Sequence, residues 1–371
     1  METRDWSLVI FTVLTQAAVG AFLTLQILQY LSARRGAPPG GRGPGRTPDQ
    51  ARETGGAREV FPAADSARSP GQQLPSPLLV VLAVLSIGLF AALFHLSTPL
   101  QAARAVVNFS SSWLSREIVF GSLFAALLSA LVWHEWRAAG SLPTGAPQEG
   151  PAAGAEPAAP VRQRFAASPA LATWLPRLTA AAGLAFICCQ IAIYLLPAQP
   201  AWNSFATPAA FGGTALRLGI LGVASGLVVQ RLTMTGDALS GNEPVVSRAA
   251  ATLRGLALAG IAALALEFVV VPLHLSSLSA NPLPAAAASV QRLTIDYGGI
   301  LLLRLGLLGA AAAALGGVVA RIRRSGGPAG PAGHSPHSLA PVLTCGAFGL
   351  TVASEVCGRF LFYAMQVRVG I

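Results

Sequence analysis

The sequence predicts an all-α protein, an integral membrane bundle of eight transmembrane helices. The first observation is composition: of 371 residues, 53% are hydrophobic and only 11% are charged, and the mean hydropathy is +0.59. A soluble domain carries about 25% charged residues. The second observation is a series of apolar stretches of membrane-spanning length, and the third is an uneven distribution of arginine between the loops. We therefore expect a single membrane domain over residues 1–371.

Apolar stretches recur eight times along the chain, at 8–31, 78–98, 117–136, 174–196, 209–230, 253–273, 298–320 and 340–363. About 20 apolar residues in a helix cover the ~30 Å hydrocarbon core of a bilayer. Lipid offers the backbone no hydrogen-bond partners, so each stretch is expected to be helical.

The first three stretches have distinct boundaries. The stretch 8–31 is too long for the apolar region of a cleavable signal peptide and is expected to be a span. The second ends at His95. The third begins at Glu117, with Ser115 as the predicted N-cap, and a carboxylate is favourable at a helix N-terminus. The five later stretches leave no room for a long soluble domain.

Two segments between the spans have a composition that cannot bury a core. Residues 33–77 are rich in Gly, Pro and Arg, and residues 137–170 are rich in Ala, Pro and Gly. Both are predicted to be disordered cytoplasmic linkers.

The arginines predict the orientation of the bundle. With the N-terminus outside, the inside loops contain 16 of the 25 basic residues and the outside segments contain five. Positive residues favour the cytoplasmic side, so both termini are expected to face outward. The net charge of +10 fits loops that face anionic lipid. It does not indicate nucleic acid as a partner, because no basic stripe with interleaved aromatic residues accompanies it.

Polar residues inside the spans are expected to gather in the outer half of the membrane. The set is Gln16, His95, Glu117, Tyr194, Arg217, Glu267, Arg304, Glu355 and Arg359. A charge at the bilayer centre costs at least ~3 kcal/mol, and the three acids and three arginines of this set can neutralise one another. The pattern predicts one polar site. Two simpler interpretations stay open: Glu355 pairs with Arg359 on its own helix, and the other arginines only connect helices.

The cysteines do not indicate a metal site. Cys188, Cys189, Cys345 and Cys357 all lie within apolar stretches, without the spacing of a zinc site or a disulfide framework. They are expected to be buried small apolar residues.

The segment from Phe94 to Phe124 contains a more specific pattern. An H-L-x-x-P turn begins at His95, and a Leu-Ser-x-Glu-Ile sequence places Glu117 22 residues later. This pattern resembles the membrane-anchor subunit of the dimethyl sulfoxide reductase family. Four further segments resemble the family in the same order: WSLVIFTVLTQAAVGAF, YLLPAQPAWNSFATPAAF, DYGGILLLRLGLL and SEVCGRFLFYAMQVRVG. The resemblance touches nearly all eight spans.

The resemblance implies a function in anaerobic respiration at the inner membrane of a bacterial cell. The family binds and oxidises menaquinol and passes electrons to an iron–sulfur subunit and then to a molybdopterin catalytic subunit. It carries no haem. Its His and Glu at these positions are implicated in quinol binding, which assigns His95 and Glu117 as the catalytic residues here. A histidine and a partly desolvated glutamate suit proton acceptance. Gln16 and Arg359 are expected to complete the quinol site.

Three other functions are compatible with some of these features. A multi-span transporter could use the buried Glu and Arg residues, although the two halves show no repeat of the kind that many transporters have. A purely structural anchor would bind no quinone. A two-haem cytochrome b needs facing histidines within the bundle, whereas the histidines here lie at span ends or in a loop: His95, His134, His274, His334 and His337.

Overall fold

The computed structural model describes residues 3–36, 76–94, 108–139, 169–233, 243–325 and 339–369, and within these ranges every regular element is a helix. The elements are α1 (Thr3–Gly36), α2 (Pro77–Leu93), α3 (Trp113–Ala139), α4 (Pro169–Tyr194), α5 (Ala206–Thr233), α6 (Glu243–Ser279), α7 (Pro284–Gln291), the π-helical turn η5 (Arg292–Asp296), α8 (Gly298–Ser325) and α9 (Leu339–Ala364). The prediction of an all-α fold is confirmed.

The eight predicted spans all correspond to helices. Seven helices in the described part of the chain are long and apolar enough to cross a membrane: α1, α3, α4, α5, α6, α8 and α9. The predicted second span corresponds to α2, an apolar helix of 17 residues, which is about 25 Å long at the standard rise. Its length is at the lower limit for a span. The chain is therefore a multi-pass membrane protein.

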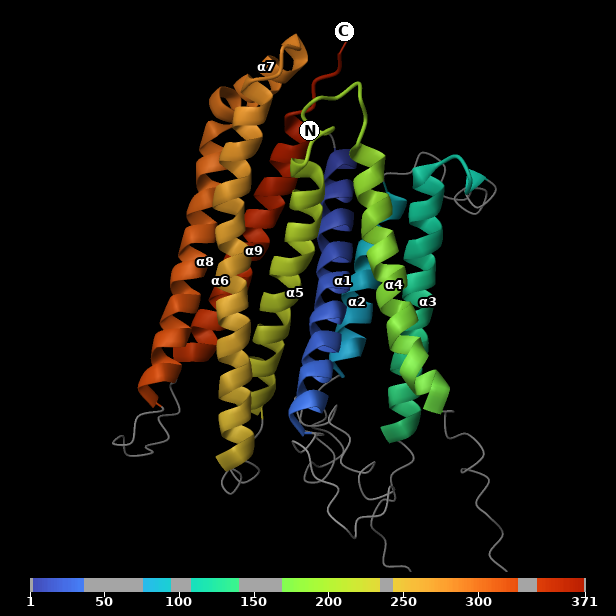
Figure 1. The fold of residues 1–371 in the computed structure, drawn as a ribbon, viewed down its shortest axis with the longest axis vertical. Helices are drawn as coiled ribbons and strands as arrows, with labels where there is room; N and C mark the ends of the chain where they lie inside the picture. The colour runs from blue at the N-terminus through green and yellow to red at the C-terminus, as the bar shows by residue number, and fades with distance from the viewer. Residues whose placement is uncertain are drawn as a thin grey trace, which may run out of the picture.

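The spans alternate in direction along the chain (Figure 1). As a result, α1 begins at the same end of the bundle at which α9 ends, and we call this the terminal end. The predicted linkers 33–77 and 137–170 lie mostly outside the described residues. Their edges differ from the prediction, because α1 continues to Gly36 and α3 continues to Ala139.

The bundle has two groups of helices, α1–α4 and α5–α9, which meet where α1 packs against α5 (Figure 1). At this crossing the two backbones nearly touch. A Cβ atom on Gly20 would lie 1.8 Å from the carbonyl oxygen of Ala215, and one on Gly219 would lie 2.2 Å from the carbonyl carbon of Gly20. Glycine is required at both positions, as is common where membrane helices approach closely.

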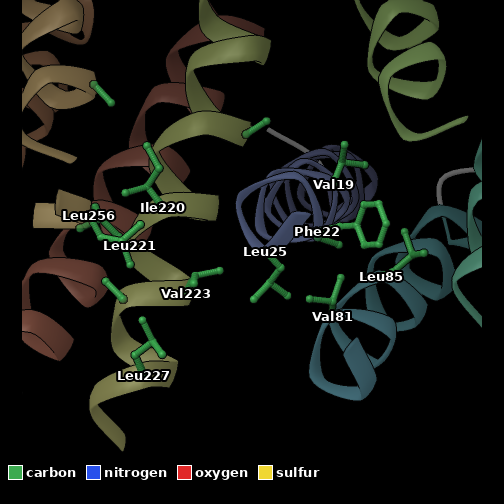
Figure 2. Packing of buried hydrophobic residues seen from close by; sticks show 14 of the residues in the cluster. Val19, Phe22, Leu25, Val81, Leu85, Ile220, Leu221, Val223, Leu227 and Leu256 are labelled. Carbon is green, nitrogen blue, oxygen red and sulfur yellow. The ribbon is translucent and has the colours of Figure 1, made fainter. Parts of the chain in front are cut away.

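Apolar side chains fill the space on both sides of this crossing. Phe22 of α1 points toward α2 near Leu85, and Leu221 of α5 belongs to the same buried cluster (Figure 2). Phe22 also meets Phe124 of α3 edge to face, with the ring centroids 5.9 Å apart. The core thus joins the two groups of helices and fixes the depth of the polar residues on them.

A short cap at the terminal end was not predicted. Helix α7 and the turn η5 connect α6 to α8, over residues between the predicted spans 253–273 and 298–320. The guanidinium of Arg292 donates hydrogen bonds to the carbonyl oxygens of Ala364 and Gln366, at 3.3 and 2.7 Å. The amide of Val369 donates to the carbonyl of Ala198 at 2.9 Å. The cap is therefore bonded to the end of α9, and the residues that follow α9 are bonded to the loop between α4 and α5.

Candidate functional site

Glu117 lies in the first turns of α3 and is buried, with 7% of its surface exposed. Its side chain lies beside that of Gln190, four residues before the end of α4. The prediction that Ser115 is the N-cap of this helix is wrong. The helix begins at Trp113, and the hydroxyl of Ser112 accepts a hydrogen bond from the Ser115 amide at 3.3 Å. The turn at Asn108–Ser112 starts the helix earlier and places Ser115 inside it.

Gln16 and Gln190 connect α1 to α4 in the interior of the bundle. The amide nitrogen of Gln16 donates to the amide oxygen of Gln190 at 3.1 Å, and the amide nitrogen of Gln190 donates to the Thr15 hydroxyl at 3.1 Å. Both glutamines are at most 1% exposed. Buried amides require such partners, because an unpaired polar group in an apolar interior is costly.

Arg359 extends these contacts from Gln16 to α5. Its NH2 group donates to the amide oxygen of Gln16 at 2.7 Å and to the hydroxyl of Thr214 at 3.4 Å. The guanidinium carbon also lies 3.9 Å from the centroid of the Phe211 ring, a favourable cation–π geometry. Gln16 and Arg359, which were assigned to one site from the sequence, are thus in direct contact.

An ion-pair cluster continues the contacts to α6 and α8. Arg217 donates from Nε to Glu355 at 2.5 Å and from NH1 to Glu267 at 2.9 Å. The hydroxyl of Thr214 donates to the second oxygen of Glu355 at 2.6 Å. Arg304 pairs with the other oxygen of Glu267. Glu355 therefore pairs with Arg217 of another helix. This contact differs from the simpler interpretation, in which Glu355 pairs with Arg359 on its own helix.

These contacts form one continuous path, which we call the polar chain: Glu117, Gln190, Gln16, Arg359, Thr214, Glu355, Arg217, Glu267 and Arg304. It links α3, α4, α1, α9, α5, α6 and α8. Every member lies in the half of its helix nearer the terminal end. The prediction that the polar residues gather at one depth thus matches the arrangement of the described residues.

His95 lies outside the described residues, so its position relative to Glu117 stays a prediction. Helix α2 ends at Leu93 and Phe94 forms its C-cap, at the terminal end of the bundle. The chain therefore reaches this end immediately before His95.

An aromatic cluster covers the polar chain toward the terminal end. The hydroxyl groups of Tyr194 and Tyr363 lie 3.0 Å apart. The ring of Trp202 stacks on Phe362 with centroids 5.3 Å apart, and its indole N–H donates to the Phe362 carbonyl oxygen at 2.7 Å. Tyrosine and tryptophan suit this level because one part of the ring is apolar and the other needs a hydrogen bond.

Two members of the polar chain were missed from the sequence. Gln190 is a single amide in the apolar sequence CCQIAIY, and Thr214 is a small hydroxyl residue in FGGTALRLG. An uncharged polar residue in a span gives a weak signal, because Thr also bonds to its own helix backbone, as Thr214 does to Ala210. For Gln190, the sequence signal that could have identified it is an amide side chain inside an apolar span. Within the described ranges, no group of three or more His, Cys, Asp and Glu residues is arranged to hold a metal ion.

Comparisons with known proteins point to one family. The family model described as DMSO reductase anchor subunit (DmsC) matches residues 63–136, a range that contains α2 and Glu117. Anaerobic dimethyl sulfoxide reductase chain YnfH of Escherichia coli (strain K12) is 23% identical over 373 residues, which cover 99% of this chain and 97% of that protein. The predicted resemblance to the dimethyl sulfoxide reductase anchor subunits is confirmed.

A second relative matches over a shorter range. A sulfite dehydrogenase subunit of Allochromatium vinosum is 43% identical over 61 residues, which cover 16% of this chain and 19% of that protein. No solved structure matches the chain. Together with the membrane-spanning helices, these similarities support the role of a membrane anchor.

Proposed function

We propose that the chain is the membrane anchor of an anaerobic molybdopterin reductase complex, in which it binds and oxidises menaquinol. The observation that carries the proposal is the direct hydrogen bond between Gln16 and Arg359, at 2.7 Å, within a polar chain that ends at the buried Glu117. Such a buried polar array is costly in a membrane protein, and intramembrane polar groups of this kind are typically functional.

The chemistry of quinol oxidation assigns roles to the predicted residues. A quinol loses two electrons and two protons when it becomes a quinone, so its two hydroxyl groups need proton acceptors. Glu117 acts as the general base for one hydroxyl, and His95 bonds the other. Gln16 and Arg359 position Glu117 through Gln190 and balance its charge. The two electrons leave to a partner subunit.

The partners follow from the same proposal. An iron–sulfur subunit docks over the terminal end, receives the electrons and passes them to a molybdopterin catalytic subunit. The terminal end faces the outside of the bacterial inner membrane, as the distribution of arginine predicts. Protons released near this end then reach water over a short distance. The anchor itself is proposed to hold neither haem nor metal, because the described histidines, His134 and His274, lie near opposite ends of the bundle.

The decisive experiment replaces Glu117 by Gln, which keeps the shape of the side chain and removes the base. Quinol-driven reduction by the membrane-bound complex should fall about a hundredfold or more if general-base catalysis is lost. Reduction driven by an artificial donor that feeds the partner subunits directly should stay at the wild-type rate. Glu135→Gln is the matched control, since Glu135 is an exposed residue near the opposite end of the same helix.

The outcomes separate a catalytic from a structural role. Loss of activity with both donors would assign the polar chain to assembly of the complex. Wild-type rates of quinol oxidation in both Glu117→Gln and His95→Ala would place the quinol site elsewhere and contradict the proposal.

A further inference from the structure

A small pocket lies between α5, α6, α8 and α9, in the half of the bundle nearer the terminal end. Counted as room for the centres of water-sized molecules, its volume is about 70 Å³. A cavity that holds one benzene ring measures about 150 Å³, so this pocket is too small for a quinone ring or a lipid tail. One water molecule needs only about 10–15 Å³ of such room, so several waters fit.

Three side chains that line this pocket have a hydrogen-bonding atom without a partner in the protein. The atoms are Nε2 of His274, Nε of Arg304 and NH1 of Arg359. All three residues are at least nine-tenths buried. Five such atoms occur in the described part of the chain, so most of them gather at this pocket. Buried polar atoms are rarely left unpaired, and the cluster therefore indicates bound polar molecules.

The charges of the lining favour a neutral occupant. The pocket is lined by two arginines and two glutamates, so their formal charges balance. Both carboxylates already have cationic partners: Glu355 is bonded to Arg217, and Glu267 is bonded to Arg217 and Arg304. An added anion or cation would leave a buried charge without compensation, which is costly in a membrane protein.

We propose that this pocket holds a cluster of ordered waters, which bond to the unpaired atoms of His274, Arg304 and Arg359. Water suits a lining with both kinds of partner, because it accepts from the guanidinium N–H groups and donates to carboxylate oxygens. A buried water typically makes about three hydrogen bonds to groups that lack other partners.

The cluster would complete the solvation of Arg359 inside the bundle. The protein gives this guanidinium only neutral hydrogen-bond partners, Gln16 and Thr214, and both bonds come from NH2. Waters at NH1 supply the remaining partners, and a bridging water is nearly as favourable in enthalpy as a direct hydrogen bond. The inference does not depend on quinol oxidation.

The test is radiolytic hydroxyl-radical labelling of the full-length chain in nanodiscs of phosphatidylcholine. A short X-ray pulse splits water, and radicals formed from an ordered buried water oxidise the side chains beside it. Phe362 lines the pocket, and Phe11 lies in the apolar core, and both are 6% exposed. Mass spectrometry should find Phe362 oxidised, together with its pocket neighbour Met365, and Phe11 unlabelled.

Paired variants locate the waters. Leu301 lines the pocket, whereas its neighbour Leu302 is 71% exposed on the outside of the bundle. Leu301→Trp should fill the pocket, so oxidation of Phe362 should be lost. Leu302→Trp should be labelled like the wild type. Ala210→Leu fills the pocket from α5 and serves if Leu301→Trp does not fold.

Two results would overturn the inference. Equal oxidation of Phe362 and Phe11 in the wild type would show that the pocket holds no ordered water. Unchanged oxidation of Phe362 in a folded variant with Leu301→Trp or Ala210→Leu would show that the radicals come from another place.

Discussion

Arg217 is the residue on which the ion-pair cluster depends. Its guanidinium is 1% exposed and contacts carboxylates of two other helices, Glu267 on α6 and Glu355 on α9. Replacing one member of a buried ion pair leaves the partner's charge without compensation, which costs about 3–5 kcal/mol. Glu267 keeps a second partner in Arg304, so Glu355 is the carboxylate that loses most when Arg217 is removed.

Arg217→Met should therefore destabilise the protein by about 3–5 kcal/mol, because methionine fills much of the space but leaves Glu355 without its cation. The measurement is denaturant unfolding of the purified chain in detergent. Arg254→Met is the control, since Arg254 is exposed on α6. A similar loss of stability in both variants would show that the ion pairs contribute no more than an exposed arginine does.

The site could be predicted in part from single residues. Polar and charged side chains in apolar spans stand out, and their depth follows from their distance to the span end, which predicts one level for Gln16, Glu117 and Arg359. Which residues touch could not be predicted, because helix rotation decides it. Rotation places Gln190 between Glu117 and Gln16, and it turns Glu355 toward Arg217. Sequence spacing within one helix contains no information on these contacts between helices.

At the scale of elements, the crossing of α1 and α5 determines whether the polar chain is continuous. Gln16 of α1 is four residues before Gly20, and Thr214 of α5 is five residues before Gly219. Close approach of the two backbones lets Arg359 reach both side chains at once. A wider crossing would separate Gln16 from Thr214.

Gly219→Ala should lower stability by about 1–3 kcal/mol, because the new methyl group would meet the backbone of Gly20 and the helices must move apart. Gly226→Ala is the matched control on the same helix, since a Cβ atom there has no neighbour within 4 Å among the described residues. Thermal unfolding in detergent compares the two. Equal unfolding temperatures would mean that the α1–α5 approach is looser than described.

Span positions were predictable because a run of apolar residues has a direct physical meaning in lipid. All eight predicted stretches overlap a helix, although their ends differ: α6 covers Glu243–Ser279, whereas the apolar run covers 253–273, and α2 ends at Leu93, whereas the predicted run continues to 98. Helix α7 was not predictable in this way, because its eight residues are too few to show periodicity and resemble a loop rich in Ala and Pro. The turn η5 has no sequence signal of its own.

At the scale of the whole molecule, the even number of spans places the start of α1 and the end of α9 at the same end of the bundle. Arginine counts predict that this end is outside. Reporter fusions after residues 50, 150, 240 and 330 should therefore all read as cytoplasmic. A periplasmic result at two or more of these four positions would reverse the predicted orientation and would move the quinol site to the inner face.

The aromatic cluster has an optical consequence. Five of the six tryptophans are at least 44% exposed on the outside of the bundle: Trp6, Trp113, Trp133, Trp136 and Trp174. Trp202 is 7% exposed and rests on Phe362, which also lines the pocket between α5, α6, α8 and α9. Its emission should lie at shorter wavelength than that of the other five. With those five replaced by phenylalanine, the chain contains one tryptophan, stacked on Phe362, and a change around that ring is reported by a change of its emission intensity, without any added label.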